Sequence, residues 1–565
     1  MNSKLSRVLG AFALTAAVAV TAAAPAAAEE PVTSGNVKFT KNIPYPLKSE
    51  GATQEGTDLE FATITVPGTG AAGDLPAGTP APPVTPISSK AKANKKKRAA
   101  CIKKAKKAKK NRGKSKKAKR NLAKAIKLCK KKFKSKKAQR AMVDVDGRRA
   151  GVQRTYAFAG SYINGLHIVD VSDPSNPIRV TTYDCAITQG DPQVFQRADL
   201  GGRWFVTFTA DGTAQESKCI DEGDALGFDT SGKGSTGTYI IEVTNPAAPK
   251  LASFVHFKKG SHNQTVHPSG KFLYNSNSDL ATDAMPGIEV VDISELTAPK
   301  EVTTIPMIPS PGLGSNAHDI YFEPDGKRAY CACVSQTVLI NTEDPAKPFV
   351  ISRIPNEYNV SHQAETIETE VSGLGKRTIL IVSDEFGGAT STGQCPNGGL
   401  HVYDVSPQVE LAPVRLGYFN ITEVRPTDDG VGTCTAHVYQ WHRPENVMIV
   451  GWYNAGFRVI DTTSFAGVAF GTTGGTGLKE LGFGRFPSGS VWAAKSPTAS
   501  RTAPFAVYSN DRARGLDAWM VDVASPAQRT GMQYEFTPAA LEAPPVSNIP
   551  PLGTLQDLFQ ASHTH

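Results

Sequence analysis

The stretch His167–Pro174 reads HIVDVSDP, an apolar strand that ends in an acid and leads through Ser into a Pro turn. Six variants of this phrase follow, each with an acid or amide after an apolar run. These marker residues are Asp170, Glu242, Asp292, Asn341, Asp404, Asp461 and Asp522. Their spacings of 49 to 72 residues indicate one supersecondary unit that repeats and stacks to bury a shared core. Seven units close most naturally into a ring, because a ring leaves no sheet edge exposed.

Each repeat has room for four strands. In the third repeat, SHNQTVHPSGKFLYNSN (Ser261–Asn277) gives an inner strand, a turn and a second strand. The marker strand GIEVVDIS and a final strand APKEVTTI follow. Four strands per repeat are typical of a propeller blade. The sequence therefore predicts an all-β, seven-bladed β-propeller, with the marker acids capping the turns that follow them.

The propeller is expected over residues 141–545, with an N-terminal segment and first strand over 29–66. Its first strand is expected at Asp58–Val66 (DLEFATITV), ahead of the insertion described below. The sequence leaves open whether the ring closes by overlap of Val37–Phe39 with the last blade. A C-terminal tail, 546–565, carries no sorting signal.

The N-terminus has the pattern of a secretory signal peptide over residues 1–28. Lys4 and Arg7 precede an apolar run, and Ala26, Ala27 and Ala28 offer a cleavage site. The apolar run is too short for a spanning helix, and no other stretch is long enough. We expect a secreted, extracellular protein that associates with the cell envelope and has no transmembrane segment.

Charge is segregated along the chain. A Gly/Pro/Ala-rich linker (67–89) leads into residues 90–140, which hold 27 of the 62 Lys and Arg residues and no acid. The remaining 35 basic residues face 52 acidic ones, so the rest of the chain carries a net charge of −17. The NRGKS break at 111–115 predicts a helical hairpin inserted in the first blade, stapled by Cys101–Cys129.

Eight cysteines in an exported chain indicate disulfides. Besides Cys101–Cys129, we expect Cys185–Cys219 and Cys395–Cys434. Cys331 and Cys333 lie on one face of a predicted strand, and the sequence leaves open whether they are reduced and buried or joined to each other.

The marker strands are similar to a known repeat. The stretches GLHIVDVSDPSNPIRV (Gly165–Val180), GLHVYDVS and GWYNAGFRVIDTT resemble the LVIVD-repeat family of exported bacterial β-propellers. The resemblance covers most of the chain apart from the signal and the basic insert. It implies the fold and not an activity, since propellers host unrelated functions.

Aligning the repeats gives a candidate metal site. Four consecutive predicted blades begin their inner strands with a histidine: His262, His318, His362 and His437. Asp58 is the predicted equivalent in the first blade, Asp191 in the second and Ser490 in the seventh. Inner strands surround the central channel, so these side chains converge there. Neutral imidazoles ligate zinc, copper, iron or nickel, which predicts a divalent transition-metal site.

The structural alternative is that repeats copied from one ancestor keep a histidine that bonds the neighbouring blade. Asp384 and Glu385 follow a strand of the fifth blade and are read either as groups supporting the metal ligands or as a solvated turn. His267 and His442 are expected at the surface. No GxSxG, HExxH or phosphate-binding loop is present in the sequence, so no catalytic residue is assigned.

Two functions follow from these observations. The first is a secreted, envelope-associated binding protein whose basic segment attaches to an anionic cell-wall or surface polymer. With Phe133 as its one aromatic residue, this segment is unsuited to sequence-specific nucleic-acid recognition. The alternative is an exported metal-dependent enzyme with a histidine-ligated metal in the channel. The sequence identifies no ligand, substrate or oligomeric state.

Overall fold

The computed structural model describes most of the predicted propeller. It covers residues 29–48, 53–66, 152–212, 214–230, 235–280, 283–309, 314–356, 360–371, 375–385, 394–395, 398–421, 425–426, 433–463 and 478–524. The predicted signal peptide, linker, basic hairpin with Cys101–Cys129, and C-terminal tail lie outside the described residues.

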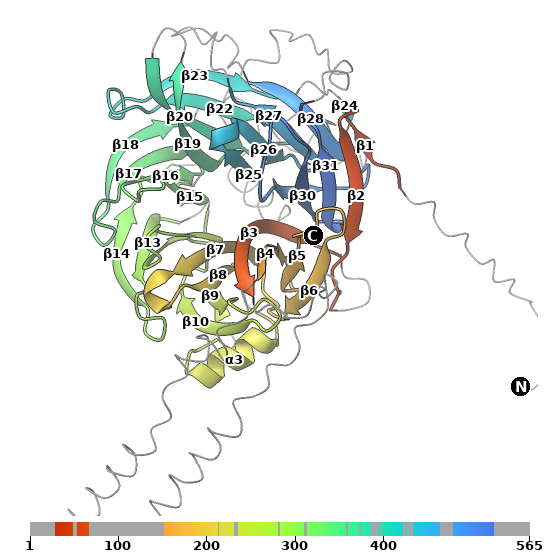
Figure 1. Ribbon diagram of the computed structural model, residues 1–565. Helices are drawn as coiled ribbons and strands as arrows, with labels where there is room; N and C mark the ends of the chain where they lie inside the picture. Colours follow the sequence, from red (N-terminus) through yellow and green to blue (C-terminus); the bar gives the residue numbers. More distant parts are fainter. Residues whose placement is uncertain are drawn as a thin grey trace, which may run out of the picture.

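The described strands form seven blades arranged in a ring, which confirms the predicted fold (Figure 1). In each blade, antiparallel strands follow one another outward from the channel. The innermost strands are β3 (Gly56–Val66), β7 (Gln189–Arg197), β11 (Asn263–Val266), β15 (Asp319–Phe322), β19 (Ser361–Val371), β25 (Tyr439–His442) and β29 (Val491–Lys495). The second strands are β4 (Val152–Ser161), β8 (Arg203–Ala210), β12 (Phe272–Ser276), β16 (Arg328–Cys333), β20 (Gly375–Asp384), β26 (Val447–Gly451) and β30 (Phe505–Asp511).

The third strands carry the repeated phrase. They are β5 (Leu166–Asp170), β9 (Gly237–Glu242), β13 (Gly287–Asp292), β17 (Gln336–Asn341), β22 (Leu400–Asp404), β27 (Phe457–Asp461) and β31 (Gly515–Val521). The markers therefore stand at or just beyond the strand ends. Asp170 Oδ1 accepts the backbone N–H of Ser172 at 3.0 Å, and Asp292 accepts that of Ser294 at 2.8 Å. These turn caps confirm the structural role predicted for the marker acids.

The outermost strands complete the blades, and one of them comes from the N-terminus. They are β6 (Ile178–Tyr183), β10 (Lys250–His256), β14 (Lys300–Pro306), β18 (Phe349–Pro355), β23 (Val414–Phe419), β28 (Lys479–Arg485) and β2 (Val37–Ile43). Strand β2 pairs with β31, so the two ends of the chain close the ring together, as the adjoining red and blue strands show in Figure 1. The short β1 (Val32–Thr33) pairs with β28 of the sixth blade.

Asn36 fastens this closure. Its side-chain amide donates to Leu481 O at 2.8 Å in the sixth blade and to Asp522 O at 3.1 Å in the seventh. The residue is 4% exposed. One amide thus bridges two blades, through one buried and one partly buried hydrogen bond, at the point where the ring closes.

The hydrophobic core lies between the blades and not within any one of them. Seven clusters of buried apolar side chains in the described residues each join two neighbouring blades. Phe158 and Phe208, for example, are fully buried between the first two blades. Because a single sheet cannot bury both faces alone, the blades stabilise one another around the ring.

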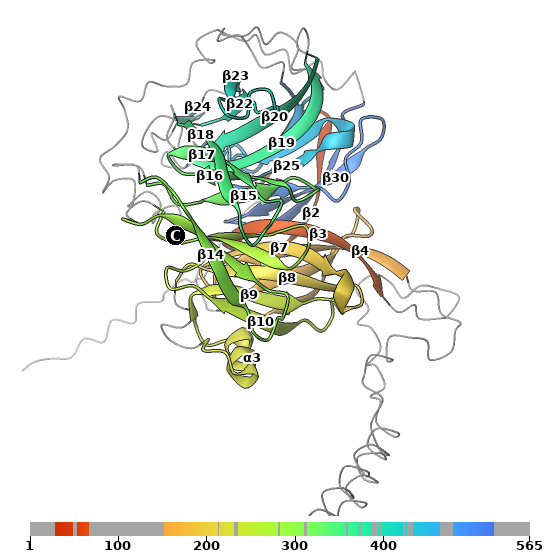
Figure 2. The ribbon, with the colours of Figure 1, turned by 90° about the vertical axis from the view of Figure 1, so that its left-hand side faces the viewer.

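Three disulfides and a few short elements accompany the blades in the described residues. Cys185–Cys219 and Cys395–Cys434 are bonded as predicted, and Cys331 is bonded to Cys333 within β16. The helix α3 (Lys218–Leu226), which contains Cys219, packs outside β10 (Figures 1 and 2). A two-stranded sheet joins β21 (Gln394–Cys395) and β24 (Arg425–Pro426). Among the described residues, no helix is long and apolar enough to cross a membrane.

Candidate metal centre

The four predicted histidines occupy one repeat position. The backbone N–H of His262 donates to Ser276 O at 2.8 Å, that of His318 to Ala332 O at 2.7 Å, and that of His437 to Gly451 O at 2.9 Å. His362 stands at the equivalent point, in the bulge that separates Ser361 from Gln363. The common backbone position confirms that the repeats align as the sequence indicates.

Each of the four imidazoles contacts the next one in chain order. Ring centroids are separated by 4.6 Å between His262 and His318, 4.1 Å between His318 and His362, and 3.9 Å between His362 and His437. None of the four residues is more than 2% exposed. Four adjacent buried imidazoles concentrate nitrogen lone pairs at one place, which a purely hydrophobic packing site would not require.

Glu385 completes the cluster. It follows β20 directly, is fully buried, and its backbone N–H donates to Val360 O at 3.2 Å. Its Oε2 lies 3.7 Å from His318 Nε2 and 4.0 Å from His362 Nε2, and its Oε1 lies 3.4 Å from His437 Nε2. The solvated-turn reading of Glu385 is therefore wrong. Asp384 points elsewhere, with its carboxylate 3.6 Å from His401 Nε2.

These separations are close to, and mostly somewhat longer than, those of ligands around one ion. Zn–N and Zn–O bonds of about 2.1 Å in tetrahedral geometry place neighbouring ligand atoms roughly 3.4 Å apart. The candidate atoms of His318, His362 and Glu385 all lie within 4.8 Å of one another. Neither Glu385 Oε2 nor His437 Nε2 has a hydrogen-bond partner in the described part of the chain, although both atoms are buried. Buried polar atoms normally have partners, so these two atoms are candidates for binding an ion.

The outer nitrogens of two histidines are held by acceptors. His437 Nδ1 lies 2.8 Å from the carbonyl oxygen of Trp492, and His262 Nδ1 lies 2.9 Å from Asp211 Oδ2. A proton on Nδ1 then leaves the lone pair of Nε2 facing the channel, the arrangement that metal-ligating histidines use. Burial lowers the pKa of His262, but the charges of Asp211 and Glu385 outweigh this effect, so the pKa lies above its usual value.

Tyr453 orients the carboxylate. Its hydroxyl donates to Glu385 Oε1 at 2.8 Å, and burial, with the nearby Glu385 charge, raises the pKa of this phenol, which therefore stays protonated. The backbone of Tyr453 has φ of 42°, an uncommon conformation for a bulky residue, and its N–H donates to Val491 O at 3.0 Å. Strain of this kind gathers at functional sites.

The structure corrects the predicted equivalents in the other blades. Asp58 Oδ1 accepts the N–H of Leu59 at 2.7 Å, just as Asn263 accepts from Gln264 and Asp319 from Ile320, both at 2.6 Å. Asp58 thus lies one residue beyond the histidine position, and Thr57 occupies that position.

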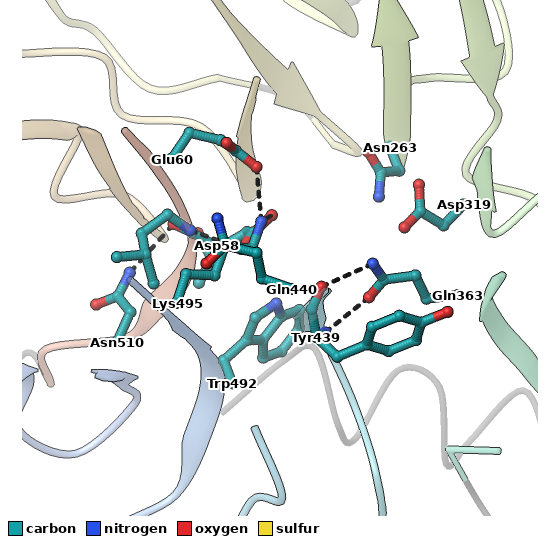
Figure 3. A network of polar contacts seen from close by, with 12 residues as sticks. Asp58, Glu60, Asn263, Asp319, Gln363, Tyr439, Gln440, Trp492, Lys495 and Asn510 are labelled. Carbon is teal, nitrogen blue, oxygen red and sulfur yellow. Dashed lines mark hydrogen bonds and ion pairs between the residues drawn. The ribbon is translucent and has the colours of Figure 1, made fainter. Parts of the chain in front are cut away.

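Asp58 holds Lys495 instead of facing the histidines, with its Oδ2 2.8 Å from Lys495 Nζ (Figure 3). The second and seventh blades are shifted too, because their bulges place Gly190 and Trp492, and not Asp191 and Ser490, at the histidine position. Bulges add residues that strand alternation does not count.

His267 is not a surface residue as predicted. It is 8% exposed, and its Nε2 lies 2.9 Å from Gly326 O of the next blade, which fastens two blades together. His442 is half-buried and contacts Gln440 Oε1 at 3.0 Å. His267 thus plays the blade-bridging role that the structural alternative assigned to the four channel histidines.

Comparison with known proteins supports the fold and leaves the chemistry undetermined. Residues 151–185 match the family model described as the LVIVD repeat, which confirms the predicted resemblance over that repeat. No curated protein matches the chain.

Solved structures similar to this chain include three proteins of distant sequence. Hydrazine synthase of Kuenenia stuttgartiensis is 12% identical over 54% of this chain and 73% of its own, with a TM-score of 0.33. The β-propeller domain of Myceliophteria thermophila Cps50 (Swd1) is 9% identical over 64% and 92%, with a TM-score of 0.40. The Pseudomonas aeruginosa periplasmic gluconolactonase is 13% identical over 55% and 73%, with a TM-score of 0.29. Likeness at this level carries no functional argument.

Proposed function

We propose that this chain is an exported β-propeller enzyme that holds a transition-metal ion in its central channel. The observation that carries the proposal is the convergence of three buried imidazoles, those of His318, His362 and His437, on Glu385, with nitrogen–oxygen separations of 3.4 to 4.0 Å. His318, His362, His437 and Glu385 would supply the ligands. His262, whose Nε2 lies 3.3 Å from His318 Nε2, stands beside them.

Nitrogen ligands with one carboxylate suit Zn²⁺ and Fe²⁺. A bound ion of this kind supplies a Lewis acid for a substrate oxygen or a bound water. The surrounding residues keep the ligands in place: Tyr453 fixes one oxygen of Glu385, and the Trp492 carbonyl fixes the ring of His437. This support distinguishes the cluster from a chance gathering of histidines.

The direct test is elemental analysis of the purified mature protein after loading with Zn²⁺, Fe²⁺ or Cu²⁺ and removal of excess metal. We expect about one ion per chain in the wild-type protein. The Glu385→Gln variant should retain at least about tenfold less metal, because this change removes one of roughly four ligands. Glutamine keeps the size of the side chain and can still accept the Tyr453 hydroxyl.

Two matched controls separate ligand loss from misfolding. Glu323→Gln changes another glutamate that accepts a tyrosine hydroxyl, that of Tyr330 at 2.9 Å, and should keep its metal. His267→Gln changes a buried histidine outside the channel, and it should lose stability without losing metal. A protein that binds none of the three metals, or a Glu385→Gln variant with undiminished stoichiometry, contradicts the proposal.

A second function concerns surface attachment and rests on the segregation of charge. Residues 90–140 carry 27 basic and no acidic residues, while the remainder of the chain is net negative. We propose that this segment attaches the exported protein to an anionic cell-wall or surface polymer. The disulfides of the described residues suit an exported protein, because such bonds persist in oxidising compartments.

Deletion of residues 90–140 tests the attachment separately from the metal. The full mature chain should sediment with purified anionic wall polymer at low salt and be released at about 1 M salt, where screening is nearly complete. The deleted chain should remain in solution and still bind metal. Equal sedimentation of both chains would exclude the segment as the attachment site.

A further inference from the structure

A chamber separate from the histidine cluster lies beside it in the channel. It has a volume of about 240 Å³, and its lining includes Asp58, Glu60, Asp191, Asp319, Glu365 and Lys495. Several of these residues directly follow the histidine position on their strands, so the chamber begins where the cluster ends. The chamber is open on one side, and its lining contains five carboxylates and one ammonium, an unusual balance for side chains that are mostly buried.

Part of this charge is balanced within the protein. Lys495 Nζ lies 2.8 Å from Asp58 Oδ2 and 2.7 Å from Glu60 Oε1 (Figure 3). Glu365 Oε2 accepts from Arg443 at 3.0 Å. One side of the chamber therefore already shows how its carboxylates hold an ammonium ion, while no cation of the described residues contacts Asp191 or Asp319.

Asp191 has a carboxylate that is not balanced by a cation among the described residues. It is 5% exposed, and within the described residues its carboxylate has no hydrogen bond or ion pair, while its backbone N–H donates to Thr209 Oγ1 at 2.9 Å. Asp319 uses one oxygen for the N–H of Ile320. Gln264, which also lines the chamber, has a buried side-chain oxygen with no partner in the described chain. The Gln264 oxygen is thus a buried acceptor without a donor, and such an acceptor points to a donor supplied by a ligand.

We propose that this chamber binds a small organic ammonium ion, with Asp191 and Asp319 as its anionic contacts and Gln264 as a further acceptor. An ammonium donates three hydrogen bonds and matches this acceptor-rich wall. Figure 3 shows Asp319 and Asn263 facing the space opposite Lys495. The volume corresponds to roughly eight water molecules at about 30 Å³ each, far more than a bare metal ion fills. Val266 and Val438 offer apolar contact to the carbon chain of the ligand.

The test is calorimetric titration of the full mature protein with n-butylamine, and with 1-butanol as the neutral molecule of the same length. We expect butylamine to bind and butanol to bind at least about tenfold more weakly, because hydrogen bonds to charged groups are the stronger ones. Asp191→Asn should weaken butylamine binding about tenfold or more. Asp325→Asn, the same change at an exposed turn, should leave binding unaltered.

Several results would overturn the proposal: equal binding of amine and alcohol, no binding of butylamine, or unchanged binding by Asp191→Asn. Binding of Ca²⁺ that depends on Asp191, with no amine binding, would also overturn it by making the chamber a metal site. If Asp191→Asn does not fold, Asp319→Asn serves as the second variant. Metal content of each variant is measured in parallel, since a folded Asp191→Asn protein should keep its metal and lose only the amine.

Discussion

The Lys495→Met variant tests whether the stability of the fold depends on one buried ammonium in the channel. The side chain of Lys495 is 7% exposed and that of Asp58 is 10% exposed, with 2.8 Å between their charged atoms. Glu60, the second partner, is 30% exposed and contributes less because solvent screens it. Methionine keeps the length of the side chain and removes the charge, which leaves the Asp58 carboxylate buried without its cation.

The expected loss is about 3–5 kcal/mol of unfolding free energy near pH 7.5, the usual cost of breaking a buried pair by removing one partner. A pH dependence should accompany it. Burial already raises the pKa of Asp58 to about 6 despite Lys495, and without that ammonium the pKa must rise further. Each tenfold gain in the proton affinity of this carboxyl is worth about 1.4 kcal/mol, and we expect the lost attraction to Lys495 to contribute about 2 kcal/mol.

The direction of this pH dependence follows from the coupling between protonation and folding. Asp58 has a higher pKa in the folded chain than in the unfolded chain, so stability falls as pH rises from about 4 through the folded pKa. The variant, with the higher folded pKa, loses more over this range. The stability gap between Lys495→Met and wild type should therefore shrink by about 2 kcal/mol between pH 7.5 and about pH 5.

Urea unfolding of both proteins at the two pH values measures this gap. The double variant Asp58→Asn, Lys495→Met provides the control, because it removes the stranded carboxylate with the cation and should recover at least half of the loss at pH 7.5. A Lys495→Met protein as stable as wild type near pH 7.5, or a gap that does not change with pH, would refute the reasoning.

Two further predictions concern the ring and a buried histidine. Asn36→Ala should cost about 2–4 kcal/mol, because two buried carbonyls of the sixth and seventh blades lose their donor; thermal unfolding would measure this, and an unchanged midpoint would show that β2 closes the ring without it. His167 is fully buried and stacked on Tyr45 at 3.7 Å, and burial, aided by Arg179, lowers its pKa well below 6.5. Below about pH 6.5 the unfolded chain then binds more protons than the folded chain. Stability therefore decreases as the pH is lowered, by about 2 kcal/mol at pH 5 for this one group. His167→Phe should flatten the fall by that amount in urea unfolding at pH 7.5 and 5, and a slope equal to that of wild type would contradict the assignment.

Much of the fold could be predicted because the repeat is local. Asp170 and Asp292 cap the turns next to them in the chain, so their role follows from a few neighbouring residues. The alignment of His262, His318 and His362 follows from the same periodicity. Asp58 was misplaced by one residue because a bulge between Gly56 and Leu59 interrupts the alternation, and the sequence does not mark that bulge.

From the sequence, Glu385 was interpreted either as a group supporting the metal ligands or as part of a solvated turn, and not as a ligand. Its burial depends on the channel to which its side chain is brought, and on contacts with Val360 and Tyr453 that are 25 and 68 positions away. The missing partner of Asp191 is equally invisible in the sequence, since an unbalanced charge is a property of everything that surrounds it.

The sequence by itself determined the number of blades, their strand content, the turn caps and the four aligned histidines, because each depends on short-range pattern repeated along the chain. Only the tertiary structure decided that β2 closes the ring, that Glu385 joins the histidines, and that Lys495 neutralises one side of an acidic chamber but not the other. These features depend on distances between residues far apart in the chain, and burial within the closed ring gives their charges and unpaired atoms an energetic weight that they would not have in water.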